Sequence, residues 1–245
     1  MRIDIMTLFT DMCEAVLGES IIGRARAAGK VEIKVTDIRD FAGNKHNKVD
    51  DMPYGGGMGM VLSPAPVYDC FKSLYGEDEP KPHLIYMSPK GKTLTQKRVI
   101  ELSKLDRIAI LCGHYEGVDQ RVLDEIVDEE ISVGDYVLTG GELPALALTD
   151  AVCRMLPGVL SDDECFTEES HYAGLLEYPQ YTRPAEWRER CVPEVLLSGN
   201  HAEIKKWRRK ESLLITKLRR EDMFSKIELS KEDEKLLTEA EKDNT

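Results

Sequence analysis

Residues 112–144 read CGHYEGVDQRVLDEIVDEEISVGDYVLTGGELP, and this stretch determines the fold that we expect for the chain. Glycines mark turns at both of its ends, and apolar residues at helical spacing lie between them. Asp119 is a suitable N-cap for a helix whose apolar face runs from 122 to 127. Pro144 suits the first turn of a second helix over 142–156, where its missing N–H costs nothing. The stretch therefore predicts two helices connected by glycine-containing loops.

Short apolar segments lie upstream of this stretch. Residues 83–89, HLIYMSP, end at Ser-Pro, and residues 108–113, IAILCG, end at a glycine. Both are apolar throughout, which is typical of strands covered on two faces in a parallel sheet. Between 31 and 36 apolar and polar residues alternate, as in a half-buried strand. Strands that alternate with helices predict an α/β domain with a mainly parallel sheet over residues 1–160.

The character of the sequence changes after residue 160. Residues 161–182 contain six acidic residues and no lysine or arginine, which predicts a flexible acidic interdomain linker. Asn200 and Glu203 then form a capping-box-like start to a helix with apolar residues from 204 to 218. We therefore expect residues 183–245 to form a small helical C-terminal domain.

The net charge of −12 is unevenly distributed. Residues 201–220 contain eight lysines and arginines against two glutamates, a local charge of +6. Because phosphate binding depends on the field within about 10 Å, an acidic chain with one basic helix is able to bind RNA. No apolar run approaches the length of a membrane span, and Asp4 interrupts the apolar N-terminus, unlike in a signal peptide. These features predict a cytoplasmic protein with no membrane partner.

The six cysteines, at positions 13, 70, 112, 153, 165 and 191, form no C-x-x-C pair. In a chain of 245 residues they are expected to be reduced thiols. Cys112, beside a glycine, is a candidate nucleophile, but a structural role is the favoured interpretation.

Three loops follow the expected strands: residues 86–91, 112–117 and 132–142. Ligands of open α/β sheets bind beyond the carboxyl ends of the strands, and glycines let a backbone approach a ligand closely. The loops favour a ligand with a heterocycle and a ribose, although each alone also fits a simple turn. The chain has neither G-x-G-x-x-G after a strand nor a P-loop, which disfavours a dinucleotide or nucleoside triphosphate site. The glycine-rich residues 54–60 fit either an anion nest or a flexible loop.

The chain resembles the TrmD-type tRNA (guanine-N1)-methyltransferases of the SPOUT superfamily over essentially its whole length. The matching motifs, in the expected order, are VDDMPYGGGMGM, YMSPKG, CGHYEGVDQRV, ISVGDYVLTGGELPA, RMLPGVL, GLLEYPQYTRP, VLLSGNHAEIKKWRRKES and LRR. The resemblance implies an α/β SPOUT domain with a deep C-terminal trefoil knot, an exception to unknotted topology. It also implies that S-adenosylmethionine binds in the knot. By motif matching, its binding residues are Tyr86, Ser88, Pro89, Gly113, Glu116, Gly117, Ser132, Val133, Gly134, Asp135, Tyr136, Val137, Leu138, Gly140, Gly141 and Pro144.

The resemblance implies two catalytic residues for methylation of guanine N1. Glu169 is the implied general base, and Arg154 stabilises negative charge on guanine O6. The family usually has aspartate at the first position, so Glu169 departs from the pattern and Glu168 is its rival. From composition alone, the linker acids also fit a solubilising role, and Arg154 fits a helix-end salt bridge.

Other roles follow from the same motifs. Glu116 is the implied ligand of a weakly bound Mg²⁺ or a counter-charge for the sulfonium. Asp50 and Gly59 are expected to shape the entrance for RNA, and Met58 replaces a frequent proline of the family. His114, where many relatives have arginine, is expected to contact RNA, although a surface histidine without a specific role fits equally well.

The implied partner is the anticodon stem-loop of tRNA, with guanine at position 37 flipped out of its stack, and no DNA partner is expected. Trp207 is expected to pack inward, and the expected phosphate contacts are Lys205, Lys206, Arg208, Arg209 and Lys210. The resemblance further implies a homodimer, in which the cofactor of one subunit faces the linker of the other. The alternatives are a SPOUT methyltransferase acting on ribosomal RNA, a non-catalytic RNA-binding protein and a nucleotide-binding regulator.

Overall fold

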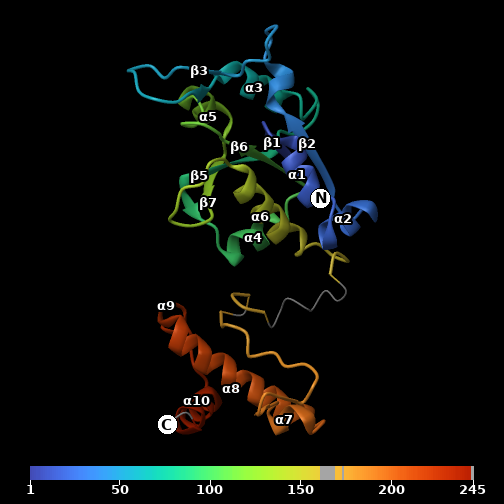
Figure 1. Ribbon diagram of the computed structural model, residues 1–245, viewed down its shortest axis with the longest axis vertical. Coiled ribbons are helices and arrows are strands. Elements are labelled where there is room, and N and C mark those ends of the chain that lie inside the picture. Colours follow the sequence, from blue (N-terminus) through green and yellow to red (C-terminus); the bar gives the residue numbers. More distant parts are fainter. Residues whose placement is uncertain (161–168, 173, 244–245) are drawn as a thin grey trace. The chain divides into compact units, whose positions relative to one another are not determined.

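The computed structural model describes residues 1–160, 169–172 and 174–243 (Figure 1). Compactness divides the chain into two units, Met1–Asp163 and Glu164–Thr245. The expected linker lies in part outside the described residues, as do Glu168 and Cys165. Within the described residues, no helix is both long and apolar enough to span a membrane.

A five-stranded parallel sheet forms the centre of the first unit, which confirms the predicted α/β class with a mainly parallel sheet. Its strand order is β2-β1-β6-β5-β7. The strands are β1 (Arg2–Thr7), β2 (Glu32–Asp37), β5 (His83–Thr93), β6 (Arg107–Cys112) and β7 (Glu129–Ser132).

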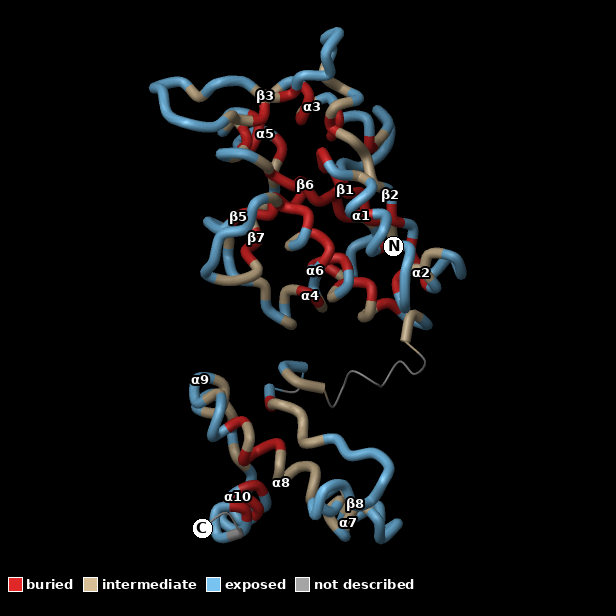
Figure 2. The backbone as a smooth tube through the Cα atoms, in the orientation of Figure 1, coloured by how far each residue is buried: buried red, intermediate tan, exposed pale blue. Residues whose placement is uncertain are grey.

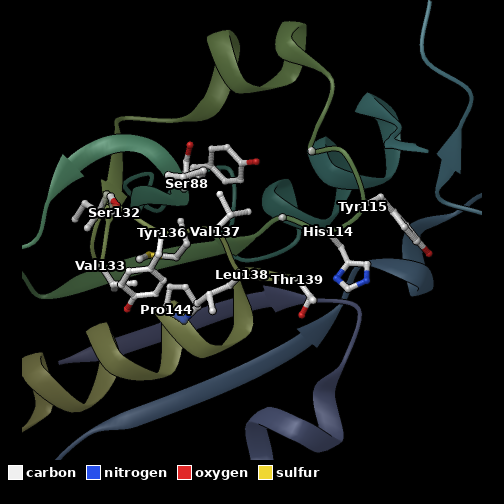
Figure 3. A pocket seen from close by; sticks show the side chains of 18 of the residues that line it. Ser88, His114, Tyr115, Ser132, Val133, Tyr136, Val137, Leu138, Thr139 and Pro144 are labelled. Carbon is white, nitrogen blue, oxygen red and sulfur yellow. The ribbon is translucent and has the colours of Figure 1, made fainter. Parts of the chain in front are cut away.

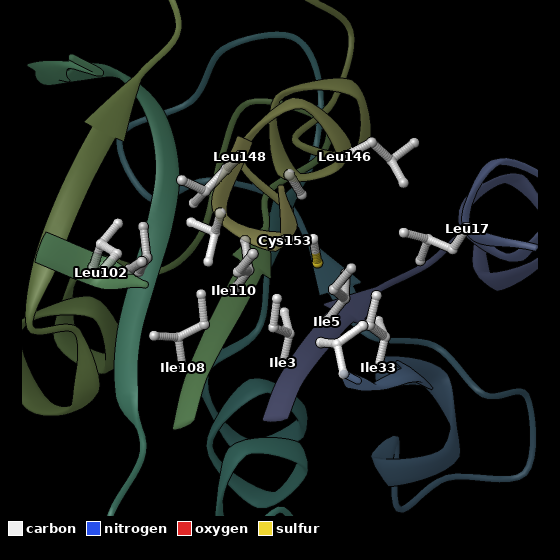
Figure 4. Close-up of a cluster of buried hydrophobic side chains, with 14 of the residues drawn as sticks. Ile3, Ile5, Leu17, Ile33, Leu102, Ile108, Ile110, Leu146, Leu148 and Cys153 are labelled. Atoms are coloured by element: carbon white, nitrogen blue, oxygen red, sulfur yellow. The ribbon is translucent and has the colours of Figure 1, made fainter. Parts of the chain in front are cut away.

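Side chains alternate between the two faces of this sheet, and each face is covered by helices. Ile3 and Ile5 of β1 and Ile108 and Ile110 of β6 contribute to the core on one face (Figure 4). Met6 and the alternate residues of the neighbouring strands enter the core on the other face. The first face packs against α1 (Thr10–Leu17), α2 (Ser20–Ala27), α4 (Gln96–Leu102) and α6 (Glu142–Cys153). The second packs against η1 (Ile38–Phe41), α3 (Pro64–Lys72) and α5 (Gln120–Ile126).

Two features of the sheet differ from the sequence-based expectation. The strand expected over 83–89 continues to Thr93, with an irregularity in its pairing with β7 between Met87 and Lys92. Strand β1 was not among the expected strands, and Asp4 lies in its middle. The Asp4 side chain is fully buried and is paired with Arg2 and Arg107, at 2.8 and 2.9 Å. These pairs compensate the cost of burying a carboxylate inside a sheet.

The helix starts expected from capping residues are confirmed. The side chain of Asp119 accepts a hydrogen bond from the N–H of Arg121 at the start of α5. The side chain of Asn200 accepts one from the N–H of Glu203 at the start of the long helix α8. A two-stranded ribbon, β3 (Asp50–Asp51) with β4 (Val61–Leu62), encloses the glycine-rich loop of the first unit.

The second unit is built around α8 (His201–Arg219), whose buried residues appear red in Figure 2. Leu175, within the expected linker, is buried with Leu213, Leu236 and Leu237. This part of the segment is therefore packed rather than exposed, because one leucine there completes an apolar core. Leu218, expected on the apolar face of the helix, is 73% exposed. The remaining elements are β8 (Glu186–Trp187), β9 (Arg190–Cys191), α7 (Glu194–Leu197), α9 (Glu221–Phe224) and α10 (Lys231–Asp243).

Candidate cofactor pocket and cationic helix

A pocket of about 250 Å³ lies at the carboxyl ends of β5, β6 and β7, beside the start of α6 (Figure 3). All of the expected cofactor residues line it except Gly134 and Asp135. Met87, Tyr115, Ile131 and Thr139 also line it. The only signal for Met87, Tyr115 and Thr139 in the sequence was their place within the three loops, and Ile131 directly precedes the third loop. The structure thus brings together three loops that are far apart in the chain.

Two glycines allow these loops to approach one another. A Cβ added to Gly141 would lie 2.7 Å from the Cα of Cys112, and its own N–H donates to the carbonyl of Gly113 at 2.8 Å. A Cβ added to Gly113 would lie 2.8 Å from the hydroxyl oxygen of Tyr86. Any side chain at either position would force the pocket walls apart.

The polar groups of the pocket are mostly paired or neutral. The hydroxyl of Ser132 donates to the carbonyl of Gly134 at 2.9 Å, and Tyr136 packs against Gly134. Burial raises the pKa of Tyr86 to about 12, and nearby Glu130 adds to the effect. Tyr86 is therefore a neutral phenol at physiological pH.

His114 lies in this pocket, although the sequence assigned it to RNA. Its ring contacts those of Phe9 and Tyr115, with centroids 4.9 and 4.8 Å apart, and its backbone pairs with Gly140. In the sequence, the only indication that this residue belongs to the pocket wall was its place in the loop 112–117.

Cys112 is also part of this region, but it is fully buried. Burial raises the pKa of its thiol well above the ordinary value, with a smaller contribution from Glu142. A thiol that remains protonated is a poor nucleophile, so the structural interpretation of Cys112 holds.

Glu116 connects the pocket to the glycine-rich loop. Its carboxylate packs so closely on Gly59 that an added Cβ there would lie 2.4 Å from Oε1. Asp50 does not line the pocket and pairs with Leu62 in the β3–β4 ribbon. Among the described residues, no group of three histidine, cysteine or acidic side chains gathers to hold a metal.

The two expected catalytic residues belong to different units. Arg154 caps the C-terminal end of α6 in the first unit, and Glu169 belongs to the second. Glu169 lines a cavity of about 530 Å³ within that unit.

This cavity also receives three of the expected phosphate-binding residues, Lys205, Arg208 and Arg209. The guanidinium of Arg208 lies 4.8 Å from the ring centre of Tyr178, and its buried Nε has no hydrogen-bond partner among the described residues. Lys206 and Lys210 do not line the cavity. Its other lining residues are Leu175, Leu176, Tyr178, His201, Ile204 and Ser212.

Two neighbouring residues on α8 have partners inside the unit. Arg209 forms an ion pair with Asp233 of α10, so its positive charge is partly neutralised within the unit. Trp207 is partly buried, with its ring centre 6.4 and 6.2 Å from those of Tyr178 and Tyr181. Trp207 therefore packs between α8 and the segment that contains Tyr178 and Tyr181.

The first unit is thus an α/β domain with a glycine-rich pocket at the carboxyl ends of its parallel strands. Residues 1–226 match the family model described as tRNA (Guanine-1)-methyltransferase TrmD. The chain belongs to this family.

Relatives in several bacteria are similar to this chain over nearly its whole length, and each is named tRNA (guanine-N(1)-)-methyltransferase. The protein of Ruminiclostridium cellulolyticum is 56% identical over 227 residues, 93% of this chain and 97% of the relative. That of Alkaliphilus oremlandii is 54% identical over 242 residues, 97% of each chain. That of Bacillus cereus is 50% identical over 237 residues, again 97% of each.

Proposed function

We propose that this protein transfers a methyl group from S-adenosylmethionine to N1 of guanine at position 37 of tRNA. The observation that carries the proposal is the composition of the pocket in a chain of this family. The described residues that line it include no lysine or arginine and one carboxylate, Glu116. Such a lining suits a cationic nucleoside without phosphate groups and disfavours a dinucleotide or a nucleoside triphosphate.

The described residues fit this cofactor. Gly113 and Gly141 bring bare backbone to the pocket, Tyr86 offers a neutral phenol, and Glu116 supplies the single negative charge. When bound, S-adenosylmethionine supplies an electrophilic methyl group. Since magnesium ligands do not gather around Glu116, we assign no step to this ion.

We assign the trefoil knot of SPOUT domains to the same region. The break in the β5–β7 pairing between Met87 and Lys92, and the bridge between His114 and Gly140, support this assignment. In this arrangement the chain from β7 to α6 passes close to the end of β6, where Gly141 contacts Cys112.

The residues proposed for the chemistry are Glu169 and Arg154. Guanine N1 carries a proton and becomes nucleophilic only when that proton leaves, so a carboxylate has to accept it. Glu169 takes this role, and the guanidinium of Arg154 stabilises the negative charge that develops on O6. The extra methylene of Glu169, compared with the usual aspartate, extends the reach of the base.

Lys205 and Arg208 are the proposed contacts with tRNA phosphates. Arg208 supports this role because it lines the cavity, where its guanidinium would pair with an anionic oxygen. The ring of Tyr178 holds the guanidinium over the cavity.

We assign Arg154 and Glu169 to a site shared between two copies of the chain in a homodimer, as the resemblance to the family implies. Mixing two inactive variants tests this arrangement, one with Glu169→Ala and one with Gly141→Val. Recovered activity in co-folded mixtures supports shared sites, whereas a mixture as inactive as its components excludes them.

A methyl-transfer assay tests the function itself. The protein is incubated with labelled S-adenosylmethionine and two tRNA transcripts, one with guanine and one with adenine at position 37. We expect label only in the first. Absence of transfer to it, or equal transfer to both, contradicts the proposal.

A further inference from the structure

Glu142, in the first turn of α6, carries a carboxyl group that the proposed reaction does not use. The residue is only 4% exposed. Its Oε1 accepts a hydrogen bond of 2.7 Å from the hydroxyl of Thr7, which is fully buried at the end of β1. The Thr7 oxygen in turn accepts one from the N–H of Phe9 at 2.9 Å. Because a buried carboxyl group is costly, this placement at the pocket edge indicates a specific role.

The second oxygen of Glu142 faces His114 across Gly140. A Cβ added to Gly140 would lie 2.3 Å from Glu142 Oε2 and 2.8 Å from His114 Nδ1, so both atoms border the same small space. His114 Nδ1 is buried and has no hydrogen-bond partner among the described residues. The imidazole is also held by its ring contacts with Phe9 and Tyr115. Nδ1 of His114 and Oε2 of Glu142 therefore lie close together beside Gly140, where any larger residue would collide with them.

We propose that Glu142 is a positioning residue of the pocket. Its Oε2 borders the same space as Nδ1 of His114, which is unpartnered among the described residues, and a small rotation of the carboxylate lets it accept a hydrogen bond from Nδ1–H. This bond fixes the neutral imidazole in the tautomer with hydrogen on Nδ1, and Nε2 becomes the acceptor. Because His114 lines the pocket, this acceptor is available to an N–H or O–H donor of a bound ligand. Glu142 also connects the end of β1 to the start of α6 and thereby steadies the wall at Gly140.

The tautomer of His114 tests the hydrogen bond without reference to any activity. Nitrogen NMR of the full-length protein, labelled at histidine, distinguishes the two tautomers at about pH 8.5, where ordinary imidazoles are neutral. His114→Asn assigns the signal. We expect the Nδ1–H tautomer in the wild type and a shift toward Nε2–H in Glu142→Met, which lacks the acceptor.

Two controls separate this role from a general loss of structure. Thr7→Val removes the bond to Oε1 and leaves Oε2 in place, so His114 keeps its tautomer. Asp150→Asn changes an exposed acid of the same helix and should have no effect. An Nε2–H tautomer in the wild type overturns the proposal even if Glu142→Met does not fold. An unchanged tautomer in folded Glu142→Met overturns it as well.

The consequence for the ligand rests on the proposed function and is measured separately, as the affinity for S-adenosylmethionine by calorimetry. We expect Glu142→Met and His114→Asn each to weaken binding about tenfold. The double variant should bind only slightly more weakly than either single variant, because each substitution alone already removes the Glu142–His114 interaction. Additive losses, or unchanged affinity despite an altered tautomer, contradict the positioning role. A wild type that does not bind the cofactor instead contradicts the proposed function and leaves the tautomer result intact.

Discussion

Arg209 and Asp233 are joined by two hydrogen bonds, Nε to Oδ1 at 2.8 Å and Nη2 to Oδ2 at 3.1 Å, which tie α8 to α10. The Asp233 carboxylate also accepts from the N–H and hydroxyl of Ser230, at 3.1 and 2.9 Å. The second unit thus uses one of its expected RNA-binding cations to hold its own helices together. A two-point guanidinium–carboxylate pair combines attraction with a fixed geometry.

This pair makes the stability of the second unit dependent on pH. The hydrogen bond from Arg209, followed by those from Ser230, lowers the pKa of Asp233 to about 2. The stabilisation is fully present above about pH 4, the ordinary pKa of an aspartate, and is lost as the pH falls toward 2. Asp233→Asn should cost about 1–2 kcal/mol of unfolding free energy at pH 7 and much less near pH 2. Urea unfolding followed across this range measures the difference.

Asp222 provides a matched control, because Arg220 likewise lowers its pKa to about 2, but the pair is exposed. Water screens such a pair, so Asp222→Asn should leave the unfolding midpoint nearly unchanged. The two arginines are equally exposed, and only Asp233 is buried, so equal effects of the two substitutions would show that burial of Asp233 is not what stabilises the unit.

Gly141 provides a second prediction. Alanine there places a Cβ against the Cα of Cys112, with 2.7 Å between the two atoms, and this backbone has no flexible side chain to move aside. We expect Gly141→Ala to weaken binding of S-adenosylmethionine at least about tenfold. Calorimetry measures the affinity, and Gly76→Ala is the control, since its added Cβ meets nothing closer than 3.8 Å. Wild-type affinity in Gly141→Ala would show that the pocket walls can separate freely.

Glu169→Gln should separate chemistry from binding. The amide preserves the shape of the side chain but does not take up a proton, so kcat should fall by about a hundredfold or more. The KM for both substrates should change little, because the base acts in the transition state. Glu177→Gln, an acid of the same segment, serves as the control in steady-state kinetics. A loss that appears in KM alone would assign Glu169 to binding.

Lys205→Ala and Arg208→Ala should each weaken tRNA binding and lower the slope of log Kd against log salt by about one. Each side chain is expected to neutralise one phosphate. Lys217→Ala is the matched control, because this lysine of α8 is paired with Glu241. Fluorescence titrations at several salt concentrations measure both quantities. An equal slope for Lys205→Ala and the wild type would remove this residue from the phosphate contacts.

Local signals in the sequence determined much of the fold. Asp119 and Asn200 begin helices where their side chains were expected to cap them, because a cap acts on N–H groups two or three residues away. The apolar segment 108–113 became the central strand β6 for an equally local reason, since only a doubly covered strand buries all of its side chains. The three glycine-containing loops were likewise identified in the sequence. That they meet around one pocket was seen only in the structure.

Contacts between distant residues were decided only by the tertiary structure. Asp4 was compatible with a buried strand once Arg107, far along the chain, paired with it. Glu142 appeared as an ordinary acid at a helix start, and only its proximity to Thr7 and the imidazole of His114 revealed a buried group at the pocket. The sequence by itself thus determined which loops and caps form. Which side chains meet across them depends on the packing of the sheet, because contacts such as Thr7 with Glu142 and Asp4 with Arg107 join residues more than a hundred positions apart.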